Sequence, residues 1–221
     1  MLETYPHADS LAQAAAHGVE AALAEALRLR RRVSLGATGG RSPGPVYDRL
    51  ATSQALDWAR VVVTLSDERC VPADHPDSNA RLVRERLLRG AASRAHLLPL
   101  WPPPETAALE TLLPFDALML GMGEDGHVAS LIPGDPGLPE KLATEALLCD
   151  VPADVGRPPL ARVTLSLAAL AGARALFLLI AGEAKRQVLA RAQAGEDLPV
   201  GRLLRQARAP VRILWAPQHE G

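Results

Sequence analysis

Apolar and polar positions alternate along the chain in a way that predicts its secondary structure. Apolar residues recur at helical spacing over residues 10–32, and the apolar run at 33–37 then predicts a strand. Further strands are predicted at 60–65, 115–121, 146–151, 162–165, 175–180 and 211–215. Further helices are predicted at 43–50, 78–88, 105–113 and 183–194. Such alternation is typical of an α/β fold, so we expect an open, mainly parallel, doubly wound (Rossmann-like) sheet with helices on both faces.

Length and composition bear on the domain organisation. With 221 residues, of which 48% are apolar, the chain is long enough to bury a substantial core. The sequence contains no repeat of fixed period and no low-complexity linker. We therefore expect a single α/β domain over residues 1–221.

Charge and hydropathy disfavour two classes of partner. The formal net charge is −1, and no basic cluster is interleaved with aromatic residues, which disfavours a nucleic-acid surface. No apolar stretch approaches the roughly 20 residues that span a bilayer, and the first residues do not resemble a signal peptide. Cys70 and Cys149 match neither a disulfide framework nor a zinc-binding spacing. We expect a cytoplasmic protein that binds neither nucleic acid nor a membrane.

The segment FDALMLGMGEDGHVASLIPG, at residues 115–134, is the best candidate for a catalytic site. Its apolar run predicts a strand buried on both faces, and ligands in open α/β sheets bind beyond the carboxyl ends of such strands. Gly123 and Gly126 allow a sharp turn, and Asp125 precedes His127 by two residues. An imidazole titrates near neutral pH, which suits a general base. We expect His127 to be catalytic and to begin a short helical stretch.

A metal site is the alternative for these residues. Asp125, His127 and His75 carry suitable ligand atoms, but their spacing matches no strong metal-binding pattern. We therefore expect no metal.

The turn TGGRSP at residues 38–43 is a candidate phosphate cradle. It follows a predicted strand and opens a helix, where Ser42 is placed to cap and Pro43 occupies the first helical position. Backbone N–H groups in such a turn can receive an anion. The turn matches neither a dinucleotide motif nor a Walker A motif, which disfavours a nucleotide. A tight turn without a ligand is the other interpretation.

Two further segments carry charged residues near strand or helix ends. The segment SDERCVPADHPDSN at 66–79 is predicted to be a polar loop that forms a binding surface, or else a solvated loop in which Asp77 or Ser78 caps the next helix. Arg162 heads a predicted strand, and Lys185 lies in the first turn of a helix. A cation there opposes the helix dipole unless an anion joins it, so Lys185 is a candidate phosphate ligand.

Together these segments resemble the 6-phosphogluconolactonase family, within a larger group that includes glucosamine-6-phosphate deaminases. The similar stretches, in order, are ATGGRSP, DERCVPADHPDSN, GMGEDGHVASLIPG and RVTLSLAAL followed by GEAKR. The resemblance implies hydrolysis of 6-phospho-D-glucono-1,5-lactone to 6-phosphogluconate in the oxidative pentose phosphate pathway. It further implies that the partner is a small sugar phosphate and that neither a metal nor an organic cofactor takes part.

The resemblance also implies a role for each candidate site residue. His127 is the general base, Asp125 orients the imidazole or holds a sugar hydroxyl, and Asp67 faces the sugar. Arg69 contacts either the phosphate or the developing oxyanion. The family turn usually reads more like SGGSTP, so Arg41 either adds a phosphate contact or points into solvent. The implied phosphate ligands are the backbone of Gly39 and Gly40 together with Ser42, Arg162 and Lys185.

Two alternative functions remain at this point. Amino-sugar-phosphate deaminases of the group resemble GxDGHIAFNEP, whereas this chain reads GHVASLIPG with no carboxylate before Asp135, which favours the lactonase. A non-catalytic sugar-phosphate sensor would normally be joined to a DNA-binding segment and would have little reason to retain His127. We expect a monomer or a weak homo-oligomer.

Overall fold

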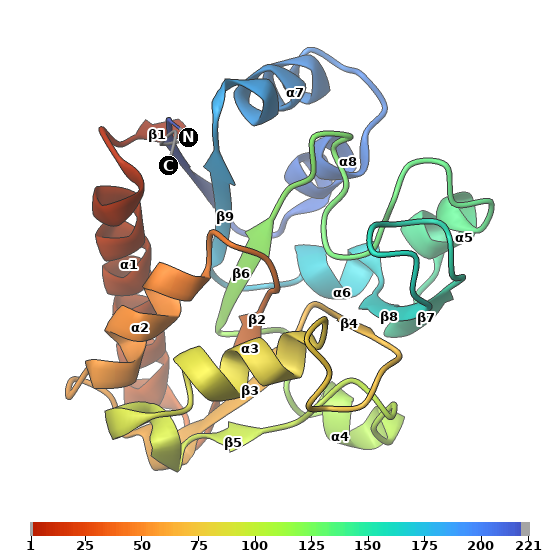
Figure 1. Ribbon diagram of the computed structural model, residues 1–221. Helices are drawn as coiled ribbons and strands as arrows, with labels where there is room; N and C mark the ends of the chain where they lie inside the picture. Colours follow the sequence, from red (N-terminus) through yellow and green to blue (C-terminus); the bar gives the residue numbers. More distant parts are fainter. Residues whose placement is uncertain (1, 218–221) are drawn as a thin grey trace.

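A large parallel sheet organises the protein, whose computed structural model describes residues 2–217 (Figure 1). All neighbouring strands of this seven-stranded sheet pair in parallel. In spatial order the strands are β1 (Leu2–Thr4), β10 (Val211–Ala216), β9 (Leu176–Ala181), β6 (Ala117–Gly121), β2 (Val33–Ala37), β3 (Val61–Leu65) and β5 (His96–Leu97).

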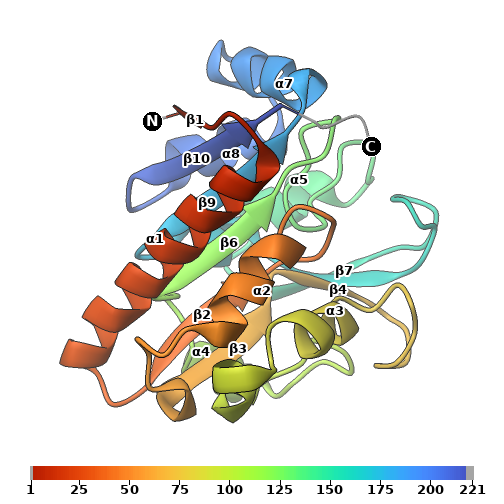
Figure 2. The same cartoon turned by 60° about the vertical axis from the view of Figure 1, so that its left-hand side comes forward.

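Helices cover both faces of the sheet. They are α1 (Ala8–Leu29), α2 (Gly44–Thr52), α3 (Asn79–Arg86), α4 (Thr106–Glu110), α5 (Leu138–Ala143), α6 (Leu167–Ala171), α7 (Glu183–Gln193) and α8 (Pro199–Gln206), with 3₁₀ turns η1 (Trp58–Arg60) and η2 (Gly90–Arg94). Figure 2 shows α1 and α2 across one face and α8 behind the sheet. The predicted doubly wound α/β fold is therefore confirmed. Between residues 2 and 217, no helix is long and apolar enough to cross a membrane.

The central strands are buried because helices pack on both of their sides. Leu118, Met119 and Leu120 of β6 are fully buried, as are Leu35 of β2 and Val63 of β3. Parallel strands covered on both faces read as continuous apolar runs rather than as alternating ones. This confirms the interpretation of the apolar run before the GEDGH turn as a buried strand.

A second, smaller sheet was not predicted. It is antiparallel and consists, in spatial order, of β4 (Asp67–Arg69), β8 (Arg162–Leu165) and β7 (Leu148–Val151). The expectation that residues 66–76 form only a loop is wrong, because the backbone of β4 pairs with β8 and the Leu165 N–H donates to the Ser66 carbonyl. The expectation that residues 146–151 and 162–165 join the parallel sheet is also wrong, because these residues form β7 and β8 of the antiparallel sheet.

The order of the parallel strands gathers four polar segments at one edge. Because β2, β3, β6 and β9 run in the same direction, the segments that follow them all leave at their carboxyl ends. The chain winds away from β2 toward β3 on one side and from β6 toward β9 on the other. In this fold class, ligands bind beyond the carboxyl ends of the strands at such a reversal of the winding direction.

Candidate active site

A histidine and an aspartate form a hydrogen-bonded pair directly after β6. His127 Nδ1 lies 2.6 Å from Asp125 Oδ1, and the His127 backbone N–H donates to the same oxygen at 3.1 Å. The turn closes with a hydrogen bond from the Gly123 N–H to the His127 carbonyl, and Gly126 has a φ of +82° that favours glycine. The His127 side chain is 37% exposed, so a ligand can reach it.

The carboxylate of this pair determines which ring nitrogen can react. Burial raises the pKa of Asp125, but hydrogen bonding and the charge of His127 outweigh it and leave that pKa below its ordinary value. An ionised Asp125 favours the imidazole tautomer that carries its proton on Nδ1, which leaves the lone pair on Nε2. The pair can therefore accept a proton at Nε2.

The segment after His127 is a tight turn, so the predicted helical stretch is wrong. Val128 and Leu131 form an isolated antiparallel bridge, and Ala129 between them has a φ of +50°. Ser130 is held by the small sheet, because its N–H donates to Thr164 Oγ1 at 3.2 Å. The positive φ of Ala129 and the bond from Ser130 to the distant Thr164 are incompatible with a continuing helix.

Asp67 connects the end of β3 to this turn. It is buried, and its two carboxylate oxygens accept hydrogen bonds from Ser66 Oγ at 3.0 Å and from Ser130 Oγ at 2.6 Å. The bond from Ser130 was not anticipated, although a hydroxyl three residues after the histidine is a visible signal. Both oxygens of Asp67 already have protein partners, and its role toward the sugar stays a prediction.

The glycine-rich turn after β2 is fixed by Tyr47 at one position and exposed at others. Tyr47 donates a hydrogen bond from its hydroxyl to the Thr38 carbonyl at 2.6 Å and accepts one from the Thr38 N–H at 2.8 Å. Gly40 has a φ of +100°, and both Gly40 and Arg41 are exposed. The predicted Ser42 cap is wrong: the flanking position of α2 is Pro43, and in the described part of the chain no side chain caps this helix. The first N–H groups of α2 are thus available to an anion.

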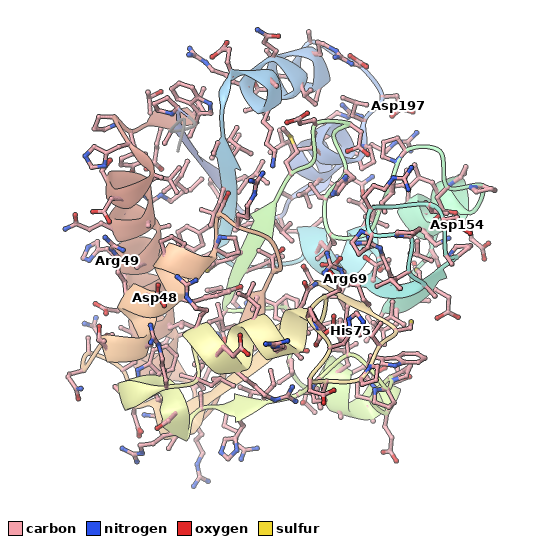
Figure 3. All side chains as sticks on the ribbon, viewed as in Figure 1. Asp48, Arg49, Arg69, His75, Asp154 and Asp197 are labelled. Carbon is pink, nitrogen blue, oxygen red and sulfur yellow. The ribbon has the colours of Figure 1, made fainter. Side chains whose placement is uncertain are left out.

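Two arginines lie opposite each other in the small sheet. Arg69 of β4 pairs in register with Arg162 of β8, and Figure 3 shows Arg69 near the centre of the molecule. Their Nη atoms donate to the carbonyls of Asp77 (2.5 Å) and Pro158 (2.9 Å), whereas within residues 2–217 the buried Nε of each has no hydrogen-bond partner. Burial lowers the pKa of Arg162, and the charge of Arg69 lowers it further. Such a pair favours an anion as a neighbour.

Lys185 is a further cation at the carboxyl edge, and its pKa responds to the charge of Arg41. It is half-buried in the first turn of α7, as predicted. Burial lowers the pKa of Lys185, Glu124 raises it, and the positive charge of Arg41 lowers it again, so these side chains lie within electrostatic range of one another. Of the predicted cations, Arg69 and Arg162 therefore lie opposite each other in register, whereas Lys185 and Arg41 interact only through their charges.

The segment between β4 and α3 contains polar groups that contact other parts of the protein. Ser78 caps α3 by accepting from the Arg81 N–H at 3.2 Å, as one of the two predicted alternatives states. His75, labelled on the loop in Figure 3, lies 3.8 Å from Asp77. Among residues 2–217 there is no group of three or more histidine, cysteine or acidic side chains that could hold a metal ion.

Glu68 was not singled out from the sequence, yet it organises this segment. Its buried carboxylate accepts hydrogen bonds from the N–H groups of Arg69 (2.7 Å), Asn79 (2.8 Å) and Ala80 (2.7 Å) and from Ser78 Oγ (3.0 Å). An anion at a helix N-terminus satisfies orphan N–H groups and complements the helix dipole. The Glu68 carboxylate therefore caps the N-terminus of α3.

Comparison with known proteins agrees with this geometry. The sequence model of the family described as glucosamine-6-phosphate isomerases/6-phosphogluconolactonase matches residues 6–215. The 6-phosphogluconolactonase of Caulobacter vibrioides is 42% identical over 97% of each chain, and that of Rhizobium meliloti is 37% identical over 98% of each. The crystal structure of a 6-phosphogluconolactonase from Shewanella baltica OS155 is 34% identical, with a TM-score of 0.89 over 98% of this chain and 97% of that one. The chain therefore belongs to the glucosamine-6-phosphate isomerase/6-phosphogluconolactonase family.

Proposed function

We propose that this protein hydrolyses 6-phospho-D-glucono-1,5-lactone to 6-phospho-D-gluconate, with His127 as the general base. The observation that carries the proposal is the His127–Asp125 pair at the carboxyl edge of the parallel sheet, in which Asp125 binds Nδ1 and leaves Nε2 to act as the base. Curated relatives with 37–42% identity over nearly the whole chain bear the name of this activity. The reaction belongs to the oxidative pentose phosphate pathway, which supports a cytoplasmic location as part of this proposal.

In the proposed mechanism, one imidazole carries every proton transfer. Nε2 of His127 takes a proton from water while the water oxygen attacks the lactone carbonyl carbon. The tetrahedral intermediate then collapses, the bond to the ring oxygen breaks, and the imidazolium returns the proton to that oxygen. Asp125 keeps the ring oriented and stabilises the transient imidazolium. A positioned general base typically contributes about 10²- to 10⁴-fold in rate.

The phosphate of the substrate matches the cationic groups at the same edge. We assign it to the backbone of Gly39 and Gly40, to Ser42, and to Lys185 and Arg162. The in-register placement of Arg69 opposite Arg162 supports one anion shared by both, so Arg69 is assigned to the phosphate rather than to the oxyanion. Arg41 is assigned to the phosphate as well, because its charge acts on Lys185. A dianion would relieve the mutual repulsion of these cations.

A deaminase of the same family is the main competing function. Ring opening of an amino sugar would call for a carboxylate after the histidine, and the first one in this chain is Asp135. The Asp135 side chain is fully buried, and its Oδ2 lies 2.9 Å from Lys141 Nζ. This carboxylate is committed to an internal ion pair, which supports the lactonase over the deaminase.

A coupled assay tests the proposal. Freshly generated 6-phosphogluconolactone is offered to the purified protein, with glucosamine 6-phosphate in a parallel reaction and the spontaneous hydrolysis rate subtracted. We expect hydrolysis of the lactone only. Activity on glucosamine 6-phosphate alone would favour the deaminase, and activity on neither would favour a sugar-phosphate sensor. Light scattering of the same sample tests the expected monomer or weak homo-oligomer.

A further inference from the structure

The two glycines of the phosphate turn exclude a side chain for different reasons. Gly40 has a φ of +100°, and a Cβ added there would meet nothing within 4 Å. Gly39 has no such left-handed backbone, but its added Cβ would lie 1.9 Å from Asn79 Oδ1 and 2.5 Å from Asn79 Cγ. Gly40 is thus required by backbone conformation, whereas Gly39 is required by its close contact with Asn79.

Asn79 is held firmly in the position that creates this contact. It is buried at the start of α3, and its backbone N–H donates to Glu68 Oε1 at 2.8 Å. Its Nδ2 donates to the backbone carbonyl of Asp67 at 2.9 Å. One side-chain amide therefore touches Gly39, after β2, with its oxygen and binds Asp67, after β3, with its nitrogen.

We propose that Asn79 is a positioning residue, which sets the separation between the phosphate turn and the Asp67–Arg69 strand. The inference rests on the proposed function, because it takes a sugar phosphate as the ligand of the turn. Tyr47 fixes Thr38 from one side and Asn79 bounds Gly39 from the other, so the turn is formed before the ligand arrives. Preorganisation of this kind lowers the cost of ordering on binding.

A double-mutant cycle tests the contact. Binding of 6-phosphogluconate is measured by calorimetry for the parent protein, Gly39→Ala, Asn79→Ala and the combination of both. Gly39→Ala is expected to weaken binding about tenfold or more, because the new methyl group displaces the turn from Asn79. The double variant is expected to bind as Asn79→Ala alone does, because alanine lacks the three side-chain atoms (Oδ1, Cγ and Nδ2) that the methyl group would meet.

Two control combinations separate this contact from a general loss of structure. Gly39→Ala with Asn79→Asp should not recover, because aspartate keeps the shape of asparagine. Gly40→Ala with Asn79→Ala should not recover either, because the cost at Gly40 comes from its φ of +100° and not from a neighbour.

The outcomes distinguish this inference from the proposed function. Recovery only in the Gly39→Ala/Asn79→Ala protein supports the positioning role, whereas equal losses with and without Asn79 would overturn it. If the parent protein failed to bind 6-phosphogluconate, the proposed function would be contradicted and no positioning role toward this ligand would remain. Urea unfolding of the same proteins would then decide whether the contact itself couples Gly39 to Asn79.

Discussion

The two polar regions at the carboxyl edge of the sheet use their side chains in opposite ways. The buried region consists of Asp67, Glu68, Asn79 and Ser130, and the open region consists of Asp125, His127 and Lys185. Glu68 is 2% exposed and accepts four protein hydrogen bonds, whereas the His127 side chain is 37% exposed. The comparison indicates that saturated groups position the backbone, whereas the groups to which we assign chemistry are more exposed.

The largest expected effect is on turnover in the open region. His127→Ala is expected to lower kcat by roughly 10²- to 10⁴-fold, because no other group takes the proton from water. Binding of 6-phosphogluconate should change little, because the cations that hold the phosphate remain. Kinetics in the coupled lactone assay and calorimetry of the same variant measure the two quantities. An unchanged kcat would remove His127 from the mechanism.

A smaller effect is expected on binding when Lys185 is replaced. Loss of one charge-assisted hydrogen bond costs about 2 kcal/mol, so Lys185→Ala should weaken 6-phosphogluconate binding roughly 30-fold. Arg191→Ala is the matched control, since it removes one charge from the last turn of α7, where Arg191 pairs with Glu196. Equal losses in the two variants would show only a loss of net charge and would contradict the assignment of Lys185.

A third prediction concerns a carboxylate that has an ion-pair partner without being fully buried. Glu3 of β1 is partly exposed, yet it binds Arg212 through two hydrogen bonds of 2.7 Å. The bond to Arg212 lowers the pKa of Glu3 from 4.5 to about 2, although burial opposes the shift. Because this pKa is depressed, the stability that the pair contributes is present above pH 4.5 and is lost as pH falls toward 2.

Glu3→Gln should therefore unfold more easily than the parent protein at pH 7, by less than about 1 kcal/mol because solvent screens the pair. The difference should vanish near pH 2. Urea titrations at the two pH values measure it, and lactone hydrolysis should remain at the parent rate. A pH-independent difference would contradict the ion-pair explanation.

The smallest effect is expected at the turn that links the two regions. Ala129 adopts a φ of +50°, which costs an alanine about 1–2 kcal/mol and a glycine little. Ala129→Gly should raise the unfolding free energy by up to about 1 kcal/mol, since the extra freedom of glycine in the unfolded chain offsets part of the gain. Ala190→Gly in α7 is the control and should lower stability by about 1 kcal/mol. Destabilisation by both would mean that Ala129 is not strained.

Local patterns in the sequence predicted the open region well. The buried strand β6 is a continuous apolar run, and the glycines, Asp125 and His127 follow it within a few residues. The position of Lys185 in the first turn of α7 was predicted because the periodicity of that helix defines its start. Each of these features depends on neighbours in the sequence, which is why pattern and spacing were sufficient.

The buried region depends on contacts between residues far apart in the chain. Three-residue β4 is too short for a periodic signal and exists because it pairs with β8. Ser130 binds Asp67, which lies 63 positions away in the sequence, and Asn79 of α3 contacts Gly39 in the turn after β2. The sequence marks these residues as polar but does not indicate which of them become saturated inside the protein.

Urea unfolding of Glu68→Gln and His127→Ala, measured side by side, tests the division between the two regions most directly. The Glu68 carboxylate accepts hydrogen bonds from the first N–H groups of α3, whereas the amide nitrogen of a glutamine would place N–H donors against some of them. Glu68→Gln should therefore lose about 3 kcal/mol of unfolding free energy. Glu85→Gln, on the exposed side of the same helix, controls for the lost charge and should change it by less than about 0.5 kcal/mol. His127→Ala should likewise stay within about 0.5 kcal/mol of the parent. Equal losses for Glu68→Gln and His127→Ala would contradict the division.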